Sequence, residues 1–492
     1  MGGGGGESNG WKTISPHPRI PPQAGEGFLK FGCASLITKF KERVRMSVTR
    51  ELAAYIVGSR PDQIPSDVQH EARRAILNYV GCAVGGSREP AVEIALQVLS
   101  PYSGSRTARV LGRGERLDPL HASLLNGISS HVLDYDDTTP SNYIHPTSPA
   151  ASALFAYACT TPVTGADLLH ALVLGFEVQT RIGDATYPAH YEAGWHSTGS
   201  IGVFGAAVAI GKLLALPLQN MIWAIGLAAT QSAGLREMFG SMGKAFHPGR
   251  SAQSGYMGAL LAQAGFTSGE YGIEGPRGFA PVTATKFDLA RITTGFGSDF
   301  GLRRNTYKPF PCGIVIHPAI DACIQIQRER RLSPGDLQAV RLKVAPLVLD
   351  LCNKRDIGKG LEGKFSVYHA AAIGLVRGKA GIAEFTDATV NDPDVKRVRE
   401  TMTVAVADDS IAEDEVIAEV TLASGERVVK HVEHAIGNLA RPMTDRELED
   451  KFRDQGAPAL GAQRSNELIA LCWSIDKLGD CRALIEAATP AP

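Results

Sequence analysis

The sequence predicts a mostly α-helical protein, in which a large helical domain is interrupted by a smaller α+β domain. Three observations support this: helical periodicity from residue 46 to about 303, partial strand-like alternation from 304 to 440, and a return to helical periodicity at 441–485. A chain of 492 residues is also too long for a single compact core. We therefore expect a discontinuous helical domain (46–303 and 441–485), an α+β domain (304–440) and an N-terminal extension (1–45).

The extension differs in composition from the rest of the chain. Gly2–Gly6 is a glycine run and Pro16–Pro22 is rich in proline, and both favour disorder. Phe28–Arg45 is rich in lysine and arginine and could form a short basic amphipathic helix, as in a targeting segment. Acidic residues in the extension weaken that interpretation. Met46 is an alternative natural start. We expect a cytoplasmic protein, or a mitochondrial one if the extension is a transit peptide.

The helical region can be followed from its capping residues. Ser47 or Thr49 can cap a first helix, and Ser66–Gln69 has the form of a capping box before Ala72–Val84. Pro119 suits the start of a helix over Leu120–Leu133. Further helices are expected at Ser148–Cys159, Gly165–Tyr187, Thr198–Leu216, Gln219–Leu235 and Arg250–Gly265. Their many glycines and alanines predict closely packed helices.

The smaller domain combines strand and helix patterns. Leu337–Val348 alternates in part like a strand, and Val416–Val432 reads as a hairpin with a glycine-containing turn. Pro318–Arg328 and Ser366–Val376 are expected to be helical. Thr444–Glu447 matches a capping box that opens the last helical part, which continues over Leu448–Arg453 and Ser465–Leu478.

Composition excludes several classes of protein. The formal net charge of −1 argues against a nucleic-acid-binding surface, and no apolar run is long enough to span a membrane. The eight cysteines are scattered, without a Cys-x-x-Cys pair, which favours reduced thiols over disulfides or a zinc site. Neither a His-Glu-x-x-His motif nor a Cys/His quartet at zinc spacing is present, and the glycine-rich stretch around Lys244 is not a P-loop. Three aspartates close together could hold a divalent ion, but His145, His196 and Lys244 suit an anionic substrate better, so no metal is expected.

One segment concentrates ionisable side chains between apolar stretches. Leu133–Ser148 contains three aspartates and His145, and such a cluster is costly in a core unless it is hydrogen-bonded or functional. The spacing of Asp134, Asp137 and Thr138 predicts that they share one helical face, with Pro140 ending the helix. Ordinary turn and capping chemistry is the alternative explanation.

Other polar groups stand at comparable positions. His196 precedes a Gly/Ala-rich helix whose N-terminus would favour an anion, although a capping turn explains it as well. Lys244 and His247 lie in a glycine-rich, apolar region, where a lysine either extends its charge to solvent or meets an anion. Lys308 and His317 fall at the predicted domain junction. Without further information, surface or capping roles explain those two as well.

Together these motifs resemble the MmgE/PrpD family, which includes 2-methylcitrate dehydratase, cis-aconitate decarboxylase and iminodisuccinate epimerase. The resemblance covers roughly residues 46–480 and leaves the extension outside. The matching motifs are Leu133-Asp-Tyr-Asp-Asp-Thr with His145-Pro, Gly194-Trp-His, Gly243-Lys-Ala-Phe-His-Pro-Gly, Lys308-Pro-Phe-Pro-Cys with His317-Pro-Ala-Ile-Asp, and Lys364-Phe-Ser-Val-Tyr. The resemblance implies that the smaller domain is a lid over a site between the two domains.

The resemblance also implies roles for individual residues. Its expected catalytic residues are Asp134, Thr138, His145, His196, Lys244 and Tyr368, and its expected substrate-binding residues are His247, Lys308 and His317. His145 would handle a proton, Lys244 would hold a substrate carboxylate, and Tyr368 would close the site from the lid. The family implies a small polycarboxylate substrate, no metal or organic cofactor, and a homodimer without nucleic-acid or membrane partners.

The reaction is left open by these residues. Water loss from 2-methylcitrate or a related hydroxy acid is the first expectation, since dehydration is common in the family. Decarboxylation of cis-aconitate to itaconate is the main alternative, followed by epimerisation of a dicarboxylate. All three need stabilisation of negative charge beside a carboxylate. A non-catalytic carboxylate-binding relative is a further alternative.

Overall fold

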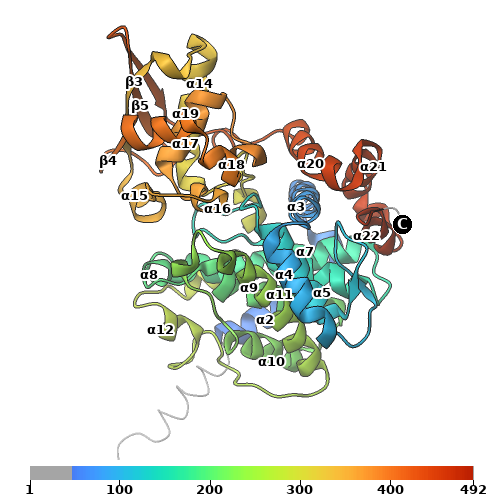
Figure 1. Cartoon of the computed structure of the whole chain (residues 1–492). Coiled ribbons are helices and arrows are strands. Elements are labelled where there is room, and N and C mark those ends of the chain that lie inside the picture. The colour runs from blue at the N-terminus through green and yellow to red at the C-terminus, as the bar shows by residue number, and fades with distance from the viewer. Residues whose placement is uncertain (1–46, 491–492) are drawn as a thin grey trace, which may run out of the picture. The chain divides into compact units, whose positions relative to one another are not determined.

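The computed structural model describes residues 47–490, so the predicted N-terminal extension lies outside the described residues. Helices predominate and the sheets are small, which confirms the predicted fold class (Figure 1). The helices of the first part are α2 (Val48–Gly58), α3 (Ser66–Gly85), α4 (Pro90–Leu99), α5 (Pro119–His131), α6 (Thr147–Ala158), α7 (Gly165–Thr186), α8 (Ala189–Glu192), α9 (Ser197–Leu213), α10 (Leu218–Ala229), α11 (Met242–Gln263), α12 (Phe279–Thr283) and α13 (Ala290–Thr293).

Two of the predicted helix starts are confirmed and one is wrong. Ser47 caps α2 by accepting a hydrogen bond from the Arg50 backbone N–H, and Pro119 is the first residue of α5. The predicted capping box at Ser66 does not form, because α3 already begins at that residue. The Gln69 side chain instead donates a 2.8 Å hydrogen bond to the Ile64 carbonyl oxygen.

Close helix crossings hold the first part together. Helix α11 packs against both α9 and α5. At the crossing with α5, a Cβ atom on Gly127 would lie only 2.4 Å from the Cα atom of Gly249. Only glycine permits this approach, since any side chain would collide with backbone. The prediction of closely packed small-residue helices is therefore correct at this crossing, which sets the distance between the chain after α5 and the start of α11.

The larger sheet has four strands in the order β4-β3-β5-β6. They are β3 (Leu337–Val344), β4 (Thr403–Ala407), β5 (Val416–Leu422) and β6 (Arg427–Val432). The predicted hairpin is confirmed as the antiparallel pair β5–β6, and β3 also pairs antiparallel with β5. Strand β4, which pairs parallel to β3, was not predicted. A separate two-stranded ladder joins β1 (Ala108–Arg109) to β2 (Arg116–Leu117).

Helices accompany the larger sheet. Helix α14 (His317–Arg330) contacts β5 and β6, and α17 (Val367–Arg377) contacts β4 and α14. The remaining short helices of this part are α15 (Pro346–Cys352), α16 (Gly360–Gly363), α18 (Asp387–Val390) and α19 (Pro393–Arg397). The predicted strand over Leu337–Val348 ends earlier, because Pro346 begins α15.

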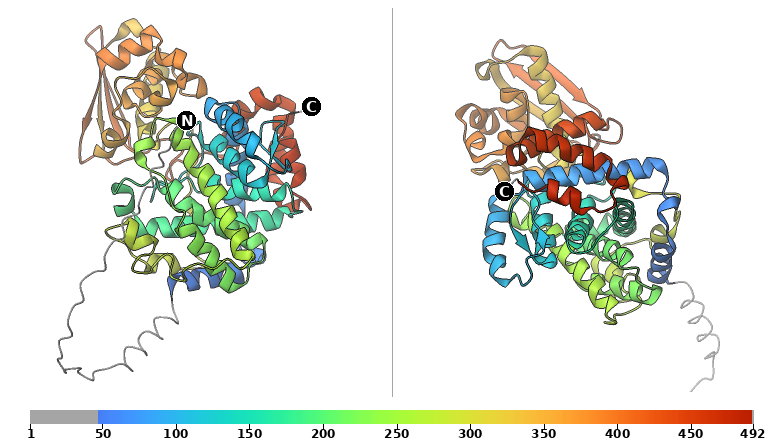
Figure 2. Two further views of the ribbon diagram at one scale, coloured as in Figure 1. Left: turned by 60° about the horizontal axis from the view of Figure 1, so that its bottom comes forward. Right: turned by 90° about the vertical axis from the view of Figure 1, so that its right-hand side faces the viewer.

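The last helices return to the first part of the chain. They are α20 (Asp445–Leu460), α21 (Ala462–Trp473) and α22 (Arg482–Ala487). Both α20 and α21 pack on α3, as Figure 2 shows from two sides. The predicted capping box is confirmed: Thr444 Oγ1 accepts from the Glu447 backbone N–H, and the Glu447 carboxylate accepts from the Thr444 backbone N–H.

Two predictions from composition can be compared with residues 47–490. None of the helices in this range is both long and apolar enough to cross a membrane. The seven cysteines described there are free thiols, in agreement with the prediction of reduced cysteines.

Candidate active site

The segment after α5 is a loop, and not the continuous helix that the spacing of its polar residues suggested. Helix α5 ends at His131, and Asp134 has a φ angle of +53°, in the left-handed region. A short polar side chain such as aspartate tolerates this conformation better than most. Backbone hydrogen bonds of 2.9 Å then pair Thr138 with Thr306 in both directions. The polar residues are therefore brought together by loop packing and not by a shared helical face.

Asp134 lies between two buried ammonium groups. Its Oδ1 atom accepts hydrogen bonds from Lys244 Nζ at 2.6 Å and from Lys308 Nζ at 2.7 Å. Burial would raise the pKa of Asp134, but the two lysines outweigh it and hold the pKa well below the usual value. With one carboxylate facing two ammonium groups, the trio has a net charge of +1. Burial lowers the pKa of Lys244, and the Asp136 carboxylate nearby offsets part of the positive charge of the trio. The two ammonium groups attract a bound anion electrostatically.

The two lysines differ in their free hydrogen-bond donors. Lys308 Nζ donates to Asp134 Oδ1, to the Asp134 carbonyl oxygen at 3.2 Å and to the Cys312 carbonyl oxygen at 3.0 Å, so its three donors are used. Within residues 47–490, Lys244 Nζ makes only the bond to Asp134. It lies 5.3 and 5.2 Å from the ring centres of Phe239 and Phe365. Lys244 is therefore the lysine with donors left for a ligand.

His145 is held in one orientation through its Nδ1 atom. This atom lies 2.8 Å from the Asp137 carbonyl oxygen, 3.1 Å from Thr138 Oγ1 and 3.3 Å from Asp136 Oδ1. A carbonyl can only accept, so Nδ1 carries the proton in the neutral ring and Nε2 keeps a free lone pair. Burial lowers the pKa of His145, against the attraction of Asp136. The geometry suits a group that takes or returns a proton through Nε2.

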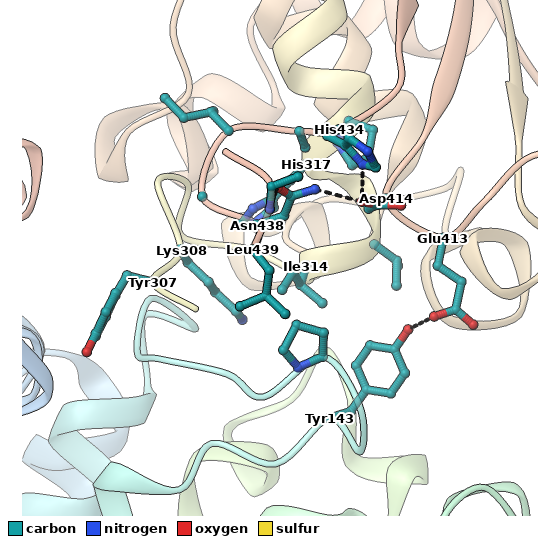
Figure 3. Close-up of a pocket in the computed structure, with 17 residues that line it drawn as sticks. Tyr143, Tyr307, Lys308, Ile314, His317, Glu413, Asp414, His434, Asn438 and Leu439 are labelled. Carbon is teal, nitrogen blue, oxygen red and sulfur yellow. Dashed lines mark hydrogen bonds and ion pairs between the residues drawn. The ribbon is translucent and has the colours of Figure 1, made fainter. Parts of the chain in front are cut away.

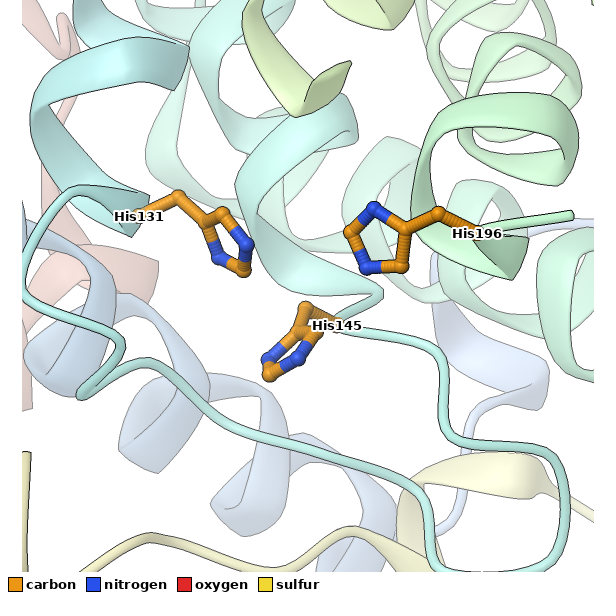
Figure 4. Close-up of side chains that lie close together, drawn as sticks. All are labelled: His131, His145 and His196. Carbon is orange, nitrogen blue, oxygen red and sulfur yellow. The ribbon is translucent and has the colours of Figure 1, made fainter. Parts of the chain in front are cut away.

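A second imidazole, His131, shares the Asp136 carboxylate. Its Nδ1 atom lies 2.9 and 2.8 Å from the two carboxylate oxygens, and its ring centre is 4.6 Å from that of His145 (Figure 4). Burial lowers the pKa of His131 to about 4. Sequence reasoning missed both His131 and Asp136 as site residues. The available signal was a histidine in the last turn of a helix with apolar residues at helical spacing, five residues before an aspartate.

His196 forms a buried pair with His247. Their Nδ1 atoms are 2.8 Å apart, so one ring donates to the other and the two share a single proton there. Burial and the neighbouring imidazole hold the pKa of His196 well below the usual value, and burial lowers that of His247 to about 4. The pair is therefore neutral near pH 7. His196 faces the site and His247 supports it from α11.

Several of these side chains line one small cavity of about 40 Å³, and His131, Asp136 and His247 lie behind its lining. Of the predicted residues, the lining includes Asp134, Thr138, His145, His196, Lys244 and Lys308. Tyr143, Tyr191, Phe239, Phe365, Ile314 and Val315 complete much of the wall, and sequence reasoning missed them. Apolar walls strengthen the electrostatic interactions of the charged groups, because they exclude water.

Three predicted site residues do not line this cavity: His247, which contacts it only through His196, and Tyr368 and His317. The Tyr368 hydroxyl donates a 2.7 Å hydrogen bond to Asn353 Oδ1, and its ring packs in the core around the larger sheet. His317 begins α14 and lines a neighbouring cavity (Figure 3), where burial lowers its pKa to about 3. The lid role of Tyr368 and the carboxylate-binding role of His317 stay predictions, which the lining of the small cavity does not support.

A third buried lysine, Lys364, fastens the site loop. Its Nζ atom donates to the Leu133 carbonyl oxygen at 2.5 Å and to the Pro311 carbonyl oxygen at 2.8 Å. Burial lowers its pKa to about 8. Because Leu133 precedes Asp134 directly, Lys364 positions the loop from the part of the chain that contains the larger sheet. The first residue of the Lys364-Phe-Ser-Val-Tyr motif therefore holds the backbone of the site loop in place.

The histidines could also be considered as metal ligands. His131, His145 and His196 each offer one nitrogen within 4.8 Å of the others. A divalent cation would, however, stand close to Lys244, whose charge already disfavours protonation of all three rings. A second set, His131, Asp134, Asp136 and His145, includes two carboxylates, but Asp134 Oδ1 is already bound by Lys244 and Lys308 and Asp136 by His131. These ion pairs favour an anion over a cation at the free end of Lys244.

Comparison with known proteins identifies the family of the chain. The family models for the MmgE/PrpD N-terminal and C-terminal domains match residues 50–292 and 310–475. Cis-aconitate decarboxylase of Aspergillus terreus is 26% identical over 471 residues, covering 90% of this chain and 96% of that protein. The human cis-aconitate decarboxylase is 25% identical over 460 residues, covering 89% and 94%. The cis-aconitate decarboxylase-like protein oryM of Aspergillus oryzae is 30% identical over 298 residues, covering 57% and 62%. The chain belongs to the MmgE/PrpD family.

Proposed function

We propose that the protein is a lyase for a small polycarboxylate and that it decarboxylates a substrate of the cis-aconitate type. The observation that carries the proposal is the buried trio of Lys244, Lys308 and Asp134, with its net positive charge, beside the free Nε2 of His145. The names of the relatives favour decarboxylation over the dehydration that ranked first from sequence alone.

Carboxylates of the substrate would bind to the groups that keep free donors. Lys244 offers its remaining N–H donors, and His196 offers Nε2–H when its Nδ1 accepts from His247. Negative charge on the bound substrate raises the pKa of nearby His145. Substrate binding thus favours the protonated form of His145, which can act as an acid.

The decarboxylation step balances with one proton. In cis-aconitate the bond between the methylene carbon and its carboxylate breaks and CO₂ leaves. The electron pair of that bond forms a new double bond to the central carbon. The old double bond shifts its pair to the far carbon, which takes a proton from His145 Nε2–H. Lys244 stabilises the negative charge that builds up on the adjoining carboxylate before protonation.

Dehydration of a 2-methylcitrate-type hydroxy acid is the second candidate. The reason is that His145 has a lowered pKa and a free Nε2 lone pair, which suits a base that removes a proton beside a carboxylate. The hydroxyl group would then leave with the electron pair of its C–O bond and take up the proton that His145 had removed, so that water is released. Epimerisation would use the same base without loss of a group.

Proton NMR of the purified protein with cis-aconitate and, separately, with 2-methylcitrate tests the proposal. We expect itaconate methylene signals from cis-aconitate. Signals of 2-methylaconitate from the second substrate, without itaconate from the first, would replace the decarboxylase by the dehydratase. Loss of neither substrate, together with tight binding of dicarboxylates, would indicate a binding protein or an epimerase. A parallel sample treated with EDTA is expected to keep its activity.

A further inference from the structure

Three consecutive backbone carbonyls of the site loop each accept a hydrogen bond from a different buried lysine. The pairs are Lys364 with the carbonyl oxygen of Leu133 at 2.5 Å, Lys308 with that of Asp134 at 3.2 Å, and Lys451 with that of Tyr135 at 2.6 Å. The three lysines are only 2–5% exposed. We call Lys308, Lys364 and Lys451 the lysine triad.

Lys451 is the member of the triad that lies on the C-terminal helix α20. Its Nζ atom also donates to Asn78 Oδ1 at 2.7 Å and lies 4.0 Å from the centre of the Tyr135 ring. The Tyr135 hydroxyl in turn donates a 2.9 Å hydrogen bond to the Pro309 carbonyl oxygen. Lys451 therefore holds Tyr135 by both its carbonyl and its ring, and that ring joins the site loop to the chain at Pro309.

Close packing of α20 on α3 sets the position of Lys451 (Figure 1). Cβ atoms on Gly81 and Gly85 of α3 would lie only 2.8 Å from side-chain atoms of Phe452 and Gln455 on α20. Phe452 and Gln455 follow Lys451 by one and four positions. Since neither glycine carries a side chain, α20 lies close enough to α3 for the Lys451 ammonium group to reach the site loop.

The charge of the triad suits a loop whose backbone conformation is unfavourable by itself. Neutral donors would be enough to pair buried carbonyls, whereas ammonium groups make stronger bonds at a cost of burial. Burial lowers the pKa of Lys364 and of Lys451 to about 8, so both stay mainly protonated near pH 7. Asp134, at the middle of the three carbonyls, has a φ angle of +53°. A residue other than glycine keeps this conformation only where its surroundings enforce it.

We propose that Lys451 is a positioning residue for the reaction, which fixes the left-handed turn at Asp134 and hence the carboxylate that Lys244 binds. The C-terminal helix α20 is then required for a competent site, although none of its residues lines the catalytic cavity. This inference rests on the proposed function for the role of Lys244 in turnover.

Lys451→Met tests the proposal on the full-length protein. Methionine fills a similar volume without a charge or a donor, so no unpaired ion is buried. We expect kcat for cis-aconitate to fall at least tenfold. Lys451→Gln, whose shorter side chain does not reach the Tyr135 carbonyl, is expected to show the same loss and serves if Lys451→Met does not fold. Arg446→Gln, at an exposed position of the same helix, is the control and should keep wild-type kinetics.

Combination with Lys244→Met separates positioning from a general loss of structure. If Lys451 acts through Asp134 on Lys244, its replacement no longer matters once Lys244 is absent. The double variant should therefore have a kcat within twofold of that of Lys244→Met. Two losses that multiply would refute the positioning role.

Amide hydrogen exchange provides a measurement that needs no turnover. The Asp134 N–H donates to the His131 carbonyl oxygen at 2.8 Å, and the Thr138 N–H donates to that of Thr306 at 2.9 Å. In Lys451→Met we expect exchange in residues 132–138 to be at least tenfold faster, with exchange in α3 and α20 as in the wild type.

The exchange result also separates this inference from the proposed function. Faster exchange confined to the site loop would support the positioning role even if the wild-type protein did not convert cis-aconitate. Unchanged exchange in the loop, or equal acceleration in α20, would overturn the positioning role while leaving any conversion of cis-aconitate in place.

Discussion

At the scale of single residues, Lys244 and Lys308 show how identical side chains acquire different roles. Both bind Asp134 Oδ1, but the backbone carbonyls of Asp134 and Cys312 use the remaining donors of Lys308. Lys308 thus shapes the loop, whereas Lys244 faces the cavity between two phenylalanine rings. The division of roles comes from the acceptors within reach and not from the residue type.

Lys244→Met should remove the excess positive charge of the site while the Lys308–Asp134 pair remains. We expect kcat/KM for cis-aconitate to fall about 100- to 1,000-fold, because the developing carboxylate charge loses its stabilising donor. Thermal unfolding should change little, since one buried charge is removed and its partner stays paired. Arg250→Gln, at an exposed position of the same helix, is the control and should retain wild-type kinetics. Wild-type activity in Lys244→Met would contradict the assigned role.

Asp136→Asn tests a positioning residue. Asp136 bonds to His131 and partly offsets the burial that lowers the pKa of His145, so the amide should lower the fraction of protonated His145 at a given pH. We expect kcat to fall about tenfold. Activity depends on protonated His145 and declines as pH rises through its pKa, so the alkaline limb of the kcat profile should shift to lower pH. A merely structural role would lower activity without that shift. Asp62→Asn, exposed beside Arg60, should leave the profile unchanged.

At the scale of elements, the crossing of α5 and α11 sets the geometry of the site. Asp134 lies three positions after the last residue of α5, and Lys244 lies in the first turn of α11. Their 2.6 Å bond therefore depends on how closely the two helices approach at Gly127 and Gly249. We therefore expect these two glycines, which do not line the cavity, to affect activity.

Gly249→Ala is expected to disturb this crossing. The added Cβ atom would lie 2.3 Å from the Leu124 carbonyl oxygen, so backbone would have to move. We expect a loss of about 1–3 kcal/mol in the free energy of unfolding, measured in urea, and about a tenfold lower kcat.

Gly258→Ala on the same helix is the matched control for Gly249→Ala. There the nearest atom to the new Cβ is 3.4 Å away, an ordinary contact. Its stability should be unchanged or higher by up to about 1 kcal/mol, because alanine favours a helix. Equal stability of the two variants would show that the crossing is not close in solution.

At the scale of the whole molecule, burial of neutral histidines makes folding sensitive to acid. Among the described residues, burial lowers the pKa to about 4 at five rings, those of His131, His170, His190, His247 and His369. At His369, burial outweighs the 3.0 Å hydrogen bond between Nε2 and the Glu384 carbonyl oxygen. In the unfolded chain these rings titrate near pH 6.5. Between pH 6.5 and about 4 the unfolded chain therefore binds more protons than the folded protein, and protonation favours unfolding.

The free energy of unfolding should consequently fall as pH is lowered below 6.5. Each such histidine contributes a slope of up to about 1.4 kcal/mol per pH unit in that window. Urea denaturation at pH 7.5, 6.5 and 5.5 measures it. We expect similar stability at the two higher values and a clear loss at pH 5.5. Replacement of His190 by Gln should reduce the slope below pH 6.5, and an unchanged stability at pH 5.5 would contradict the buried neutral rings.

Much of the fold could be predicted from local patterns. The α5 start at Pro119, the β5–β6 hairpin and the Thr444 capping box all depend on residues close together in the chain. Strand β4 could not be predicted in this way, because its pairing with β3 joins residues about 60 positions apart. The early end of α5 was also missed, since the loop after it is held by Thr306, Lys308 and Lys364.

Local sequence patterns were enough to predict the helical character, the α+β segment and six of the residues that line the candidate site. Helical periodicity, capping and a concentration of ionisable groups are local properties of the chain. Only the tertiary structure decided that Lys308 has no free donor, that Tyr368 and His317 lie outside the catalytic cavity, and that His131 and Asp136 belong with His145. The physical reason is that hydrogen-bond partners and burial depend on segments far apart in sequence, and these decide which polar groups remain free to act.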